Sequence, residues 1–340
     1  MKVSVLITTY NHEKYIGQTI DSVLMQQVNF DYEIVIGEDC STDRTREIVL
    51  DYQSRHPDKI RVLLRERVDA ERERALGLGG KTNFVKALES CRGQYVALLD
   101  GDDYWLDPYK LQKQAEFLDT HSECSICFHD VLVVREDGDQ EPERFCDPNQ
   151  KEISTIEDLL EGNFIQTCST MYRQGLFDVF PDWFYTSKVG DWPLHIMNAR
   201  RGKVGYLNKV MAAYRVHPES VWSSRTVSER VIVSIALMEH VDAYLALEYH
   251  DRITAIISRW RNLLGEDYYH LAEGHYQRGD STSARLYLTK YISFRGIRER
   301  RVWSLSLRLR TPLFYKLLRA LRDSVLSRDA RRLPSSLIDK

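Results

Sequence analysis

The 340-residue chain contains no run of about 18 apolar residues, so the sequence predicts no membrane-spanning helix. A secretory leader is not expected either, because the short apolar run 3–7 follows Met1 and Lys2 directly and polar residues come next. The six cysteines are scattered through a chain that is long enough to fold without disulfides, which is typical of a reducing compartment. We therefore expect a cytoplasmic protein.

Two motifs that would indicate other functions are incomplete. The glycine-rich segment 77–80 is not a dinucleotide-binding fingerprint, because Thr82 occupies the last glycine position and no apolar strand directly precedes the segment. Cys124, Cys127 and His129 resemble half of a zinc site, but no second ligand pair follows at the required spacing. We interpret these cysteines as core residues.

The net charge of −3 conceals a strongly basic C-terminal segment. Residues 290–332 contain thirteen Lys or Arg and three acidic residues, and apolar residues form one face of a helix predicted from Pro312 onwards. Two interpretations stay open for this segment. Residues 296–332 could bind an anionic membrane surface from the inner face, or the helix could pack on its own domain with a solvated basic face. No nucleic acid partner is expected.

Short β-branched runs alternate with helical patterns through the first hundred residues, which predicts a mostly parallel α/β sheet flanked by helices. The predicted strands are 3–7, 33–36, 60–64 and 95–99. Residues 41–43 offer N-cap chemistry for a helix that ends near Pro57. Beyond about residue 226 the pattern is helical throughout, and two segments, 268–279 and 283–291, resemble one helical hairpin.

Three acidic residues, Asp100, Asp102 and Asp103, directly follow the apolar strand 95–99. The carboxyl end of such a strand is where open α/β sheets bind ligands. Three crowded carboxylates repel one another, and a divalent cation that also binds phosphate oxygens would relieve this repulsion. The alternative is a solvated acidic turn before the helix that follows Pro108.

Three segments of the sequence resemble the motifs of glycosyltransferase family 2, whose members are inverting enzymes with the GT-A fold. The segments are Val5 to Asn11, Ile36 to Thr45 and Gly93 to Trp105, in the order and spacing of the family. The resemblance covers roughly residues 1–220 and implies a GT-A fold. With it, we predict a catalytic domain at 1–224 and a helical C-terminal region with a basic tail at 225–340. The catalytic domain would consist of a nucleotide-binding half, 1–105, and an acceptor-binding half, 106–224.

The resemblance also implies which residues bind the donor. These are Thr9, Tyr10, Asn11, Glu38, Asp39, Lys81, Asn83, Asp100 and Gly101. Tyr10 would border the base, and Asp39 would accept a hydrogen bond from a base N–H. The family usually has Asp-Asp-Gly where Glu38, Asp39 and Cys40 stand, so the nucleotide preference stays open. Simple turn, N-cap and solvated-lysine roles are the structural alternatives for these residues.

By the same resemblance, Asp102, Asp100 and His217 would hold Mn²⁺ or Mg²⁺, and the imidazole favours Mn²⁺. Asp191 resembles the catalytic acidic position of the family and is the expected general base. Its structural alternative is an N-cap aspartate, because a helical pattern follows it.

The implied activity is transfer of a sugar from a nucleoside-diphosphate sugar, with a UDP-sugar favoured, to an acceptor hydroxyl. The acceptor would be a saccharide or a lipid-linked saccharide, in surface polysaccharide or glycoconjugate synthesis. Two alternatives are weighed against it. One is a sugar nucleotidyltransferase, whose Gly-rich N-terminal signature is absent after the strand 3–7. The other is a non-catalytic nucleotide-sugar-binding or scaffold protein.

Overall fold

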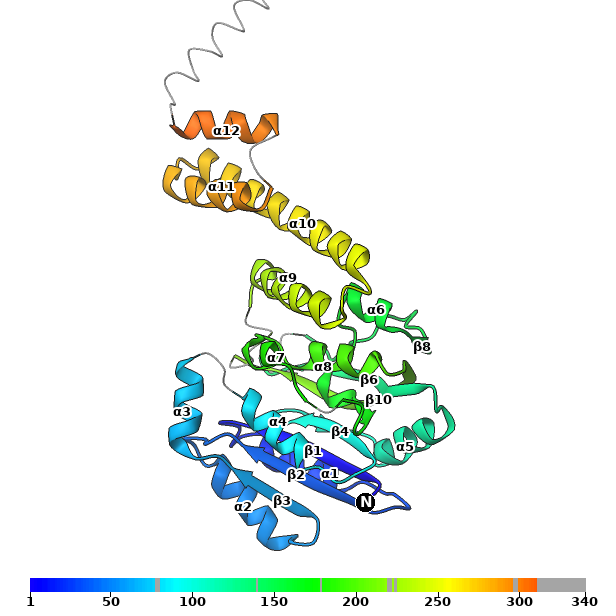
Figure 1. The fold of residues 1–340 in the computed structure, drawn as a ribbon. Helices are drawn as coiled ribbons and strands as arrows, with labels where there is room; N and C mark the ends of the chain where they lie inside the picture. The colour runs from blue at the N-terminus through cyan, green and yellow to red at the C-terminus, as the bar shows by residue number, and fades with distance from the viewer. Residues whose placement is uncertain are drawn as a thin grey trace, which may run out of the picture. The chain divides into compact units, whose positions relative to one another are not determined.

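The structure is a computed structural model that describes residues 1–76, 80–138, 140–177, 179–218, 222, 225–295 and 299–310. The chain divides into two compact units (Figure 1). The first comprises Met1–Arg225 and Ala236–Leu247, and the second comprises Thr226–Ile235 and the described residues from Glu248 onwards. The basic helix predicted from Pro312 lies outside the described residues, as does most of the proposed membrane-binding segment 296–332.

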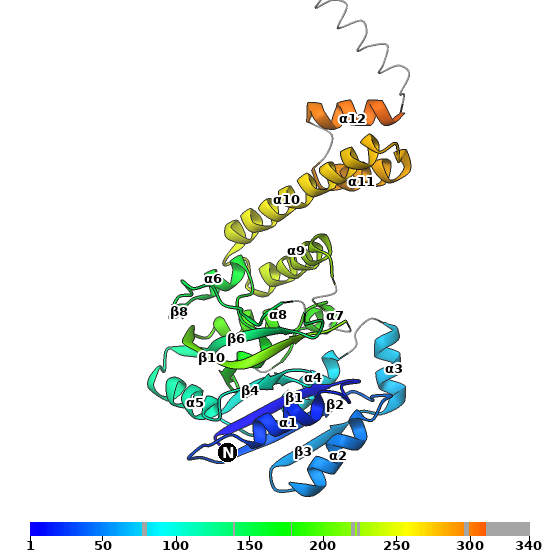
Figure 2. The same ribbon diagram turned by 180° about the vertical axis from the view of Figure 1, so that it is seen from behind.

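The described part of the first unit is built on a mixed sheet (Figures 1 and 2). The sheet has ten strands, and its main path has the order β3-β2-β1-β4-β9-β6-β10-β5. The strands are β1 (Val3–Thr9), β2 (Tyr32–Glu38), β3 (Ile60–Leu64), β4 (Tyr95–Asp100), β5 (Tyr104–Trp105), β6 (Cys124–Arg135), β7 (Glu143–Arg144), β8 (Ile153–Ser154), β9 (Met171–Arg173) and β10 (Lys203–Val216). The first four in sequence are mutually parallel, and β6 is parallel to β10. The predicted α/β sheet is therefore confirmed.

Helices cover both faces of this sheet. Alternate strand residues such as Val5, Ile34 and Ala97 form one apolar face with three helices, α1 (Ile16–Leu24), α2 (Thr45–Arg55) and α5 (Lys110–Thr120). On the opposite face, α4 (Lys81–Glu89) approaches β2 so closely that a Cβ at Gly37 would lie 3.1 Å from Ala87 Cβ. The other elements of this unit are α3 (Arg67–Ala75), α6 (Ile156–Glu161), the 3-10 turn η1 (Thr167–Ser169), α7 (Asp182–Thr186) and α8 (Asp191–Ala199).

Two local expectations differ from the structure. Of residues 41–43, only Asp43 caps α2, because its Oδ1 accepts from the N–H of Thr45, the first residue of the helix, while Arg44 stands at the N-cap position. Ser41 instead accepts a hydrogen bond from the Asn11 N–H, and Asp43 accepts from the N–H groups of Glu13 and Thr45. The second difference is α3, a helix in a charged stretch where the apolar periodicity of a helix is missing.

The described residues of the second unit are helical, with α10 (His250–Gln277), α11 (Ser281–Arg295) and α12 (Arg300–Arg310). Helix α9 (Val227–Tyr244) contributes residues to both units. The predicted hairpin is present, because α10 and α11 share an apolar core that includes Leu264, Tyr268 and Leu288. The expected C-terminal helical region is thus confirmed. None of the helices in the described ranges is long and apolar enough to cross a membrane.

Candidate active site

The carboxyl ends of β1, β2 and β4 bring the three predicted donor-binding segments together. Thr8 pairs in register with Gly37 on one side and with Asp100 on the other. Its hydroxyl donates to Asp100 Oδ1 over 2.8 Å, and its carbonyl accepts from the Gly101 N–H over 2.8 Å. Parallel pairing therefore places the start of the acidic cluster beside the first loop of the sheet.

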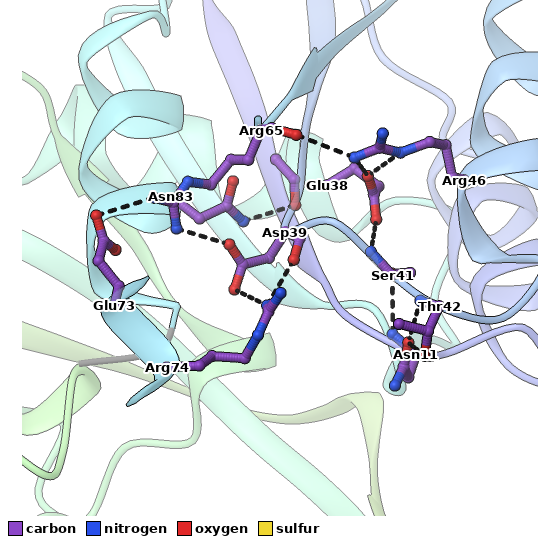
Figure 3. Close-up of polar contacts among 11 residues, drawn as sticks. Asn11, Glu38, Asp39, Ser41, Thr42, Arg46, Arg65, Glu73, Arg74 and Asn83 are labelled. Atoms are coloured by element: carbon purple, nitrogen blue, oxygen red, sulfur yellow. Dashed lines mark hydrogen bonds and ion pairs between the residues drawn. The ribbon is translucent and has the colours of Figure 1, made fainter. Parts of the chain in front are cut away.

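Asp39 lies just beyond β2 and is held by two arginines that flank it (Figure 3). Arg65 Nη1 donates to Asp39 Oδ1 over 2.8 Å, and Arg74 Nη1 donates to the Asp39 carbonyl over 2.8 Å. The side chains of Asp39 and Arg65 are both only 6% exposed. Burial raises the pKa of Asp39, and the two guanidinium groups offset this only in part. Asp39 is therefore a rigidly oriented acceptor.

The loop conformation around Asp39 explains why glycine is usual at the position of Cys40. Cys40 has a φ of 58°, in the left-handed region that glycine adopts at little cost. Asn11 also has a positive φ, of 55°, and its side-chain oxygen accepts from the Thr42 N–H over 2.8 Å. The loops after β1 and β2 are therefore tied to each other (Figure 3). Next to them, the Arg74 guanidinium lies over the Tyr10 ring, 4.5 Å from its centroid.

Glu38 and Asn83 are buried, and both form hydrogen bonds to the backbone close to Asp39. Glu38 accepts hydrogen bonds from Arg46 Nε over 2.5 Å and from the Ser41 N–H over 2.6 Å. Asn83 Nδ2 donates to the Gly37 carbonyl over 2.8 Å. Both side chains act on the backbone that carries Asp39.

The acidic cluster gathers residues from three distant parts of the chain. Asp102 Oδ2 lies 3.0 Å from His217 Nε2 and 3.9 Å from His12 Nε2. Asp103 is buried, and its Oδ1 accepts from the Arg215 N–H over 2.8 Å. The long strand β10 makes this possible, because it pairs with β5 and so returns the chain to the acidic cluster.

The carboxylates of the cluster perturb one another strongly. Desolvation, together with the neighbouring Asp102 charge, raises the pKa of Asp100 to about 7. The pKa of Asp103 is also raised well above its usual value, by burial and by the charges of Asp102 and Asp100. Burial also acts on Asp102, but the hydrogen bond from His217 and the charge of His12 outweigh it, so its pKa is lowered. Asp102 is therefore the anionic member of the group.

Gly101 allows the first loop to lie directly against the acidic turn. A Cβ at this position would stand 2.6 Å from Thr9 Oγ1 and 2.7 Å from His12 Nδ1. Any larger residue would force one of these two side chains to move, so this turn conformation requires glycine. Thr9 and Gly101, both predicted to contact the donor, are thus adjacent in space.

Asp191 is the first residue of α8 and follows the N-cap Gly190. Its Oδ2 accepts a hydrogen bond from Asn163 Nδ2 over 2.9 Å. The Lys81 ammonium passes so close to Gly190 that a Cβ there would lie 2.5 Å from Nζ. Desolvation lowers the pKa of Lys81 to about 8, although the nearby Asp191 and Asp100 carboxylates act in the opposite direction. Lys81, Asp100 and Asp191 therefore form one electrostatic group.

Within the described ranges, no set of three or more His, Cys, Asp or Glu side chains is arranged as a complete metal site. The residues nevertheless suit a hard divalent cation. Asp100 and Asp103 have raised pKa values because they are buried and lie near other carboxylates, and Asp102 has His217 as a neighbour. Mg²⁺ and related ions often take only one or two protein carboxylates and complete their shell with phosphate oxygens and water.

Four residues of the site were not anticipated from the sequence. His12 adjoins the Thr8 to Asn11 segment, so its proximity to that motif was a usable signal. Arg65 directly follows β3, and Arg74 lies on α3; both contact Asp39, from 26 and 35 residues away in sequence. Asn163 lies in a loop and contacts Asp191, 28 residues away. Pattern and spacing give no indication of such contacts.

The described residues form an α/β sheet of the GT-A type, with polar residues at the carboxyl ends of its parallel strands, where such sheets bind ligands. Residues 4–181 match Glycosyl transferase family 2. The chain belongs to this family. The predicted resemblance is confirmed.

Individual relatives agree with this assignment. An uncharacterized protein of Mycobacterium tuberculosis is 37% identical over 229 residues, which cover 67% of this chain and 62% of that protein. The chain therefore matches less than two thirds of that relative's length. Two solved structures share the fold at low identity. Staphylococcus aureus TarS has a TM-score of 0.54 at 20% identity, covering 93% of this chain and 53% of that one. Mannosyltransferase PcManGT from Pyrobaculum calidifontis, in complex with GDP-Man and Mn²⁺, has a TM-score of 0.52 at 14% identity, covering 98% and 88%.

Proposed function

We propose that the protein is an inverting glycosyltransferase that moves a sugar from a UDP-sugar to a hydroxyl of a saccharide or lipid-linked saccharide. The observation that carries this proposal is the electrostatic group of Lys81, Asp100 and Asp191, which puts a candidate base close to the candidate diphosphate site. TarS is a poly(ribitol-phosphate) β-N-acetylglucosaminyltransferase, and it has been solved with UDP-GlcNAc. A UDP-sugar donor and a surface polymer or glycoconjugate as product fit this relationship.

In the proposed donor complex, the residues at the ends of β1 and β2 bind the nucleoside. Asp39 accepts a hydrogen bond from the base, and the Tyr10 side chain borders the base ring. Thr9 and Asn11 line the same loop, while Glu38 and Asn83 keep its backbone in place. Lys81, Asp100 and Gly101 lie toward the diphosphate, where the lysine ammonium offsets phosphate charge.

Asp102, Asp100 and His217 are the residues that would hold Mn²⁺ or Mg²⁺. Such an ion supplies charge neutralisation for a departing diphosphate. The lowered pKa of Asp102 keeps this carboxylate ionised and ready to bind a cation at neutral pH. Protons on Asp100 and Asp103 would be released when a cation arrives, so we expect donor and cation binding to weaken as the pH falls.

In the proposed transfer step, the Asp191 carboxylate accepts the proton of the acceptor hydroxyl. The hydroxyl oxygen forms a bond to the anomeric carbon, and the bond between that carbon and the phosphate oxygen breaks with its electron pair leaving on the diphosphate. Attack from the opposite face inverts the configuration. Lys81 keeps a positive charge near both Asp191 and the diphosphate side of the site, so it favours the ionised base.

Thermal unfolding with a panel of nucleotide sugars tests the donor assignment. UDP with Mn²⁺ should raise the unfolding temperature, and removal of Mn²⁺ with EDTA should abolish the rise, because only the folded protein binds the ligand. No stabilisation by any nucleotide sugar would contradict the proposal.

Asp191→Asn tests the base. We expect it to lower turnover by roughly a hundredfold or more while the UDP- and Mn²⁺-dependent stabilisation persists, because general bases contribute about 10² to 10⁴ in rate. Asp182→Asn, at the first residue of α7, is a matched control on a neighbouring helix start and should keep turnover. Near-normal transfer by folded Asp191→Asn would show that another group takes the proton.

A further inference from the structure

The loop between α6 and η1 carries an asparagine whose side-chain amide is held at both ends. Asn163 Oδ1 accepts from the Ile165 N–H over 3.2 Å, in a local turn. This contact determines which end of the amide is the oxygen, so the NH₂ end points the other way. Asn163 Nδ2 donates to Asp191 Oδ2 over 2.9 Å. The direction of the hydrogen bond to Asp191 is therefore set by the turn.

The core fixes the separation between this loop and α8. Trp192, the residue after Asp191, is buried, and its indole N–H donates to the Leu159 carbonyl of α6 over 2.8 Å. Leu159 is fully buried in the same interior. Because α6 ends directly before Gly162 and Asn163, this indole bond locks the amide and the carboxylate into one rigid arrangement.

Other charged or titratable groups surround Asp191, but they act through space. Lys81 on α4 attracts its charge, Asp100 on β4 repels it, and His195 lies one turn further along α8. Burial lowers the pKa of His195 to about 4, so this imidazole is neutral at pH 7. These influences set the charge of the site without orienting the carboxylate, whereas a hydrogen bond of 2.9 Å is directional.

We propose that Asn163 is a positioning residue that holds one oxygen of Asp191 so that the other is presented to the acceptor hydroxyl. This inference rests on the proposed role of Asp191 as the general base. A base must lie within hydrogen-bond reach of the proton that it takes, and small displacements are costly in rate. Asn163 would thus act on the transfer step and leave donor binding alone.

Two variants separate positioning from a structural role. Asn163→Asp retains an oxygen for the Ile165 N–H and so preserves the turn, but it replaces the donor to Asp191 with a repelling carboxylate. Asn163→Leu removes the donor without adding charge. Turnover is measured as UDP release from UDP-GlcNAc with Mn²⁺, at several pH values, with water as the acceptor. If the donor screen selects GDP-mannose, the release of GDP from GDP-mannose is measured instead.

We expect Asn163→Leu to lower kcat by roughly tenfold to a hundredfold with the donor KM unchanged, which is the effect of losing one hydrogen bond to a charged group. Asn163→Asp should lose more rate, because it also places a repelling carboxylate beside Asp191. If the asparagine only builds the turn, Asn163→Asp will match the wild type, and that result overturns the proposal.

Asn198→Leu is the matched control. Asn198 is a buried asparagine of α8 whose amide donates to the Leu194 carbonyl, so its loss perturbs the same helix away from Asp191. It should keep kcat even where the unfolding temperature falls, and an equal loss of kcat would make the effect of Asn163 a general one and overturn the proposal. Asp191→Asn distinguishes the two levels. If that variant is inactive and both Asn163 variants are normal, only the positioning role fails; if it is fully active, the base assignment fails and the positioning role fails with it.

Discussion

Lys110 is a lysine with no exposed surface, and its burial makes stability depend on pH. Its ammonium donates to Gln114 Oε1 over 2.7 Å and lies 4.0 Å from the centre of the Trp105 ring. Desolvation lowers its pKa from the usual 10.5 to about 7. Between these two values the unfolded chain carries a proton that the folded protein lacks.

The sign of the effect follows from this difference in bound protons. Stability rises with pH wherever the unfolded state binds more protons, so Lys110 should stabilise the fold progressively as the pH rises above 7. From pH 7 to 8.5 its share of the free energy of unfolding should increase by roughly 1.5 kcal/mol, at 1.36 kcal/mol for each full unit. Below pH 6 both states are protonated and the contribution is constant.

Lys110→Met should remove this contribution, because methionine fills similar space and carries no titratable group. Urea unfolding followed by tryptophan fluorescence at pH 6, 7, 7.75 and 8.5 gives the comparison. The difference in free energy of unfolding between wild type and variant should change by roughly 1.5 kcal/mol across the window. Lys113→Met is the control. Lys113 lies on α5, the same helix as Lys110, but it is partly exposed and pairs with Asp107. Parallel pH profiles for wild type and Lys110→Met would refute the reasoning.

Two further variants test the donor side of the site. Arg65→Met leaves the buried Asp39 carboxylate without its main partner and should cost about 3 kcal/mol in urea unfolding. Arg55→Met breaks an exposed pair with Asp51 and should cost at most about 0.5 kcal/mol, and equal losses would contradict the argument. Gly101→Ala places a Cβ 2.6 Å from Thr9 Oγ1, so it should destabilise the fold by about 1–3 kcal/mol and weaken UDP- and Mn²⁺-dependent thermal stabilisation. Gly162→Ala, which meets nothing within 4 Å, should leave both unchanged, and a Gly101→Ala variant that does the same would argue against the close packing of that turn.

The first four strands within residues 1–105 could be predicted from the sequence because each has a local apolar pattern. The run Val96 to Leu99 is apolar on both faces, and the structure extends that strand by one residue to Asp100. Helical spacing after the first strand similarly led to α1. Where apolar periodicity and a turn signal coincide, the local pattern and the final fold agree.

Other parts of the site depend on contacts that no local pattern records. Arg74 lies on a helix with only one buried residue, Ala70, so the apolar periodicity that identifies helices is missing there. Asn163 contacts Asp191 through the packing of two short helices, and nothing around it differs from an ordinary loop. The position of His217 was expected from the family resemblance, whereas its contact with Asp102 results from the register of β10 with β5.

Strand β10 determines where the first unit can be cut. The region that matches the family ends at residue 181, before β10 begins at Lys203. A fragment that stopped there would uncover one edge of β6, an interior strand with mostly buried side chains, and would separate Asp102 from His217. A bare, apolar strand edge is a template for pairing with other chains. The smallest fragment that closes the sheet must therefore run past the family boundary, through His217.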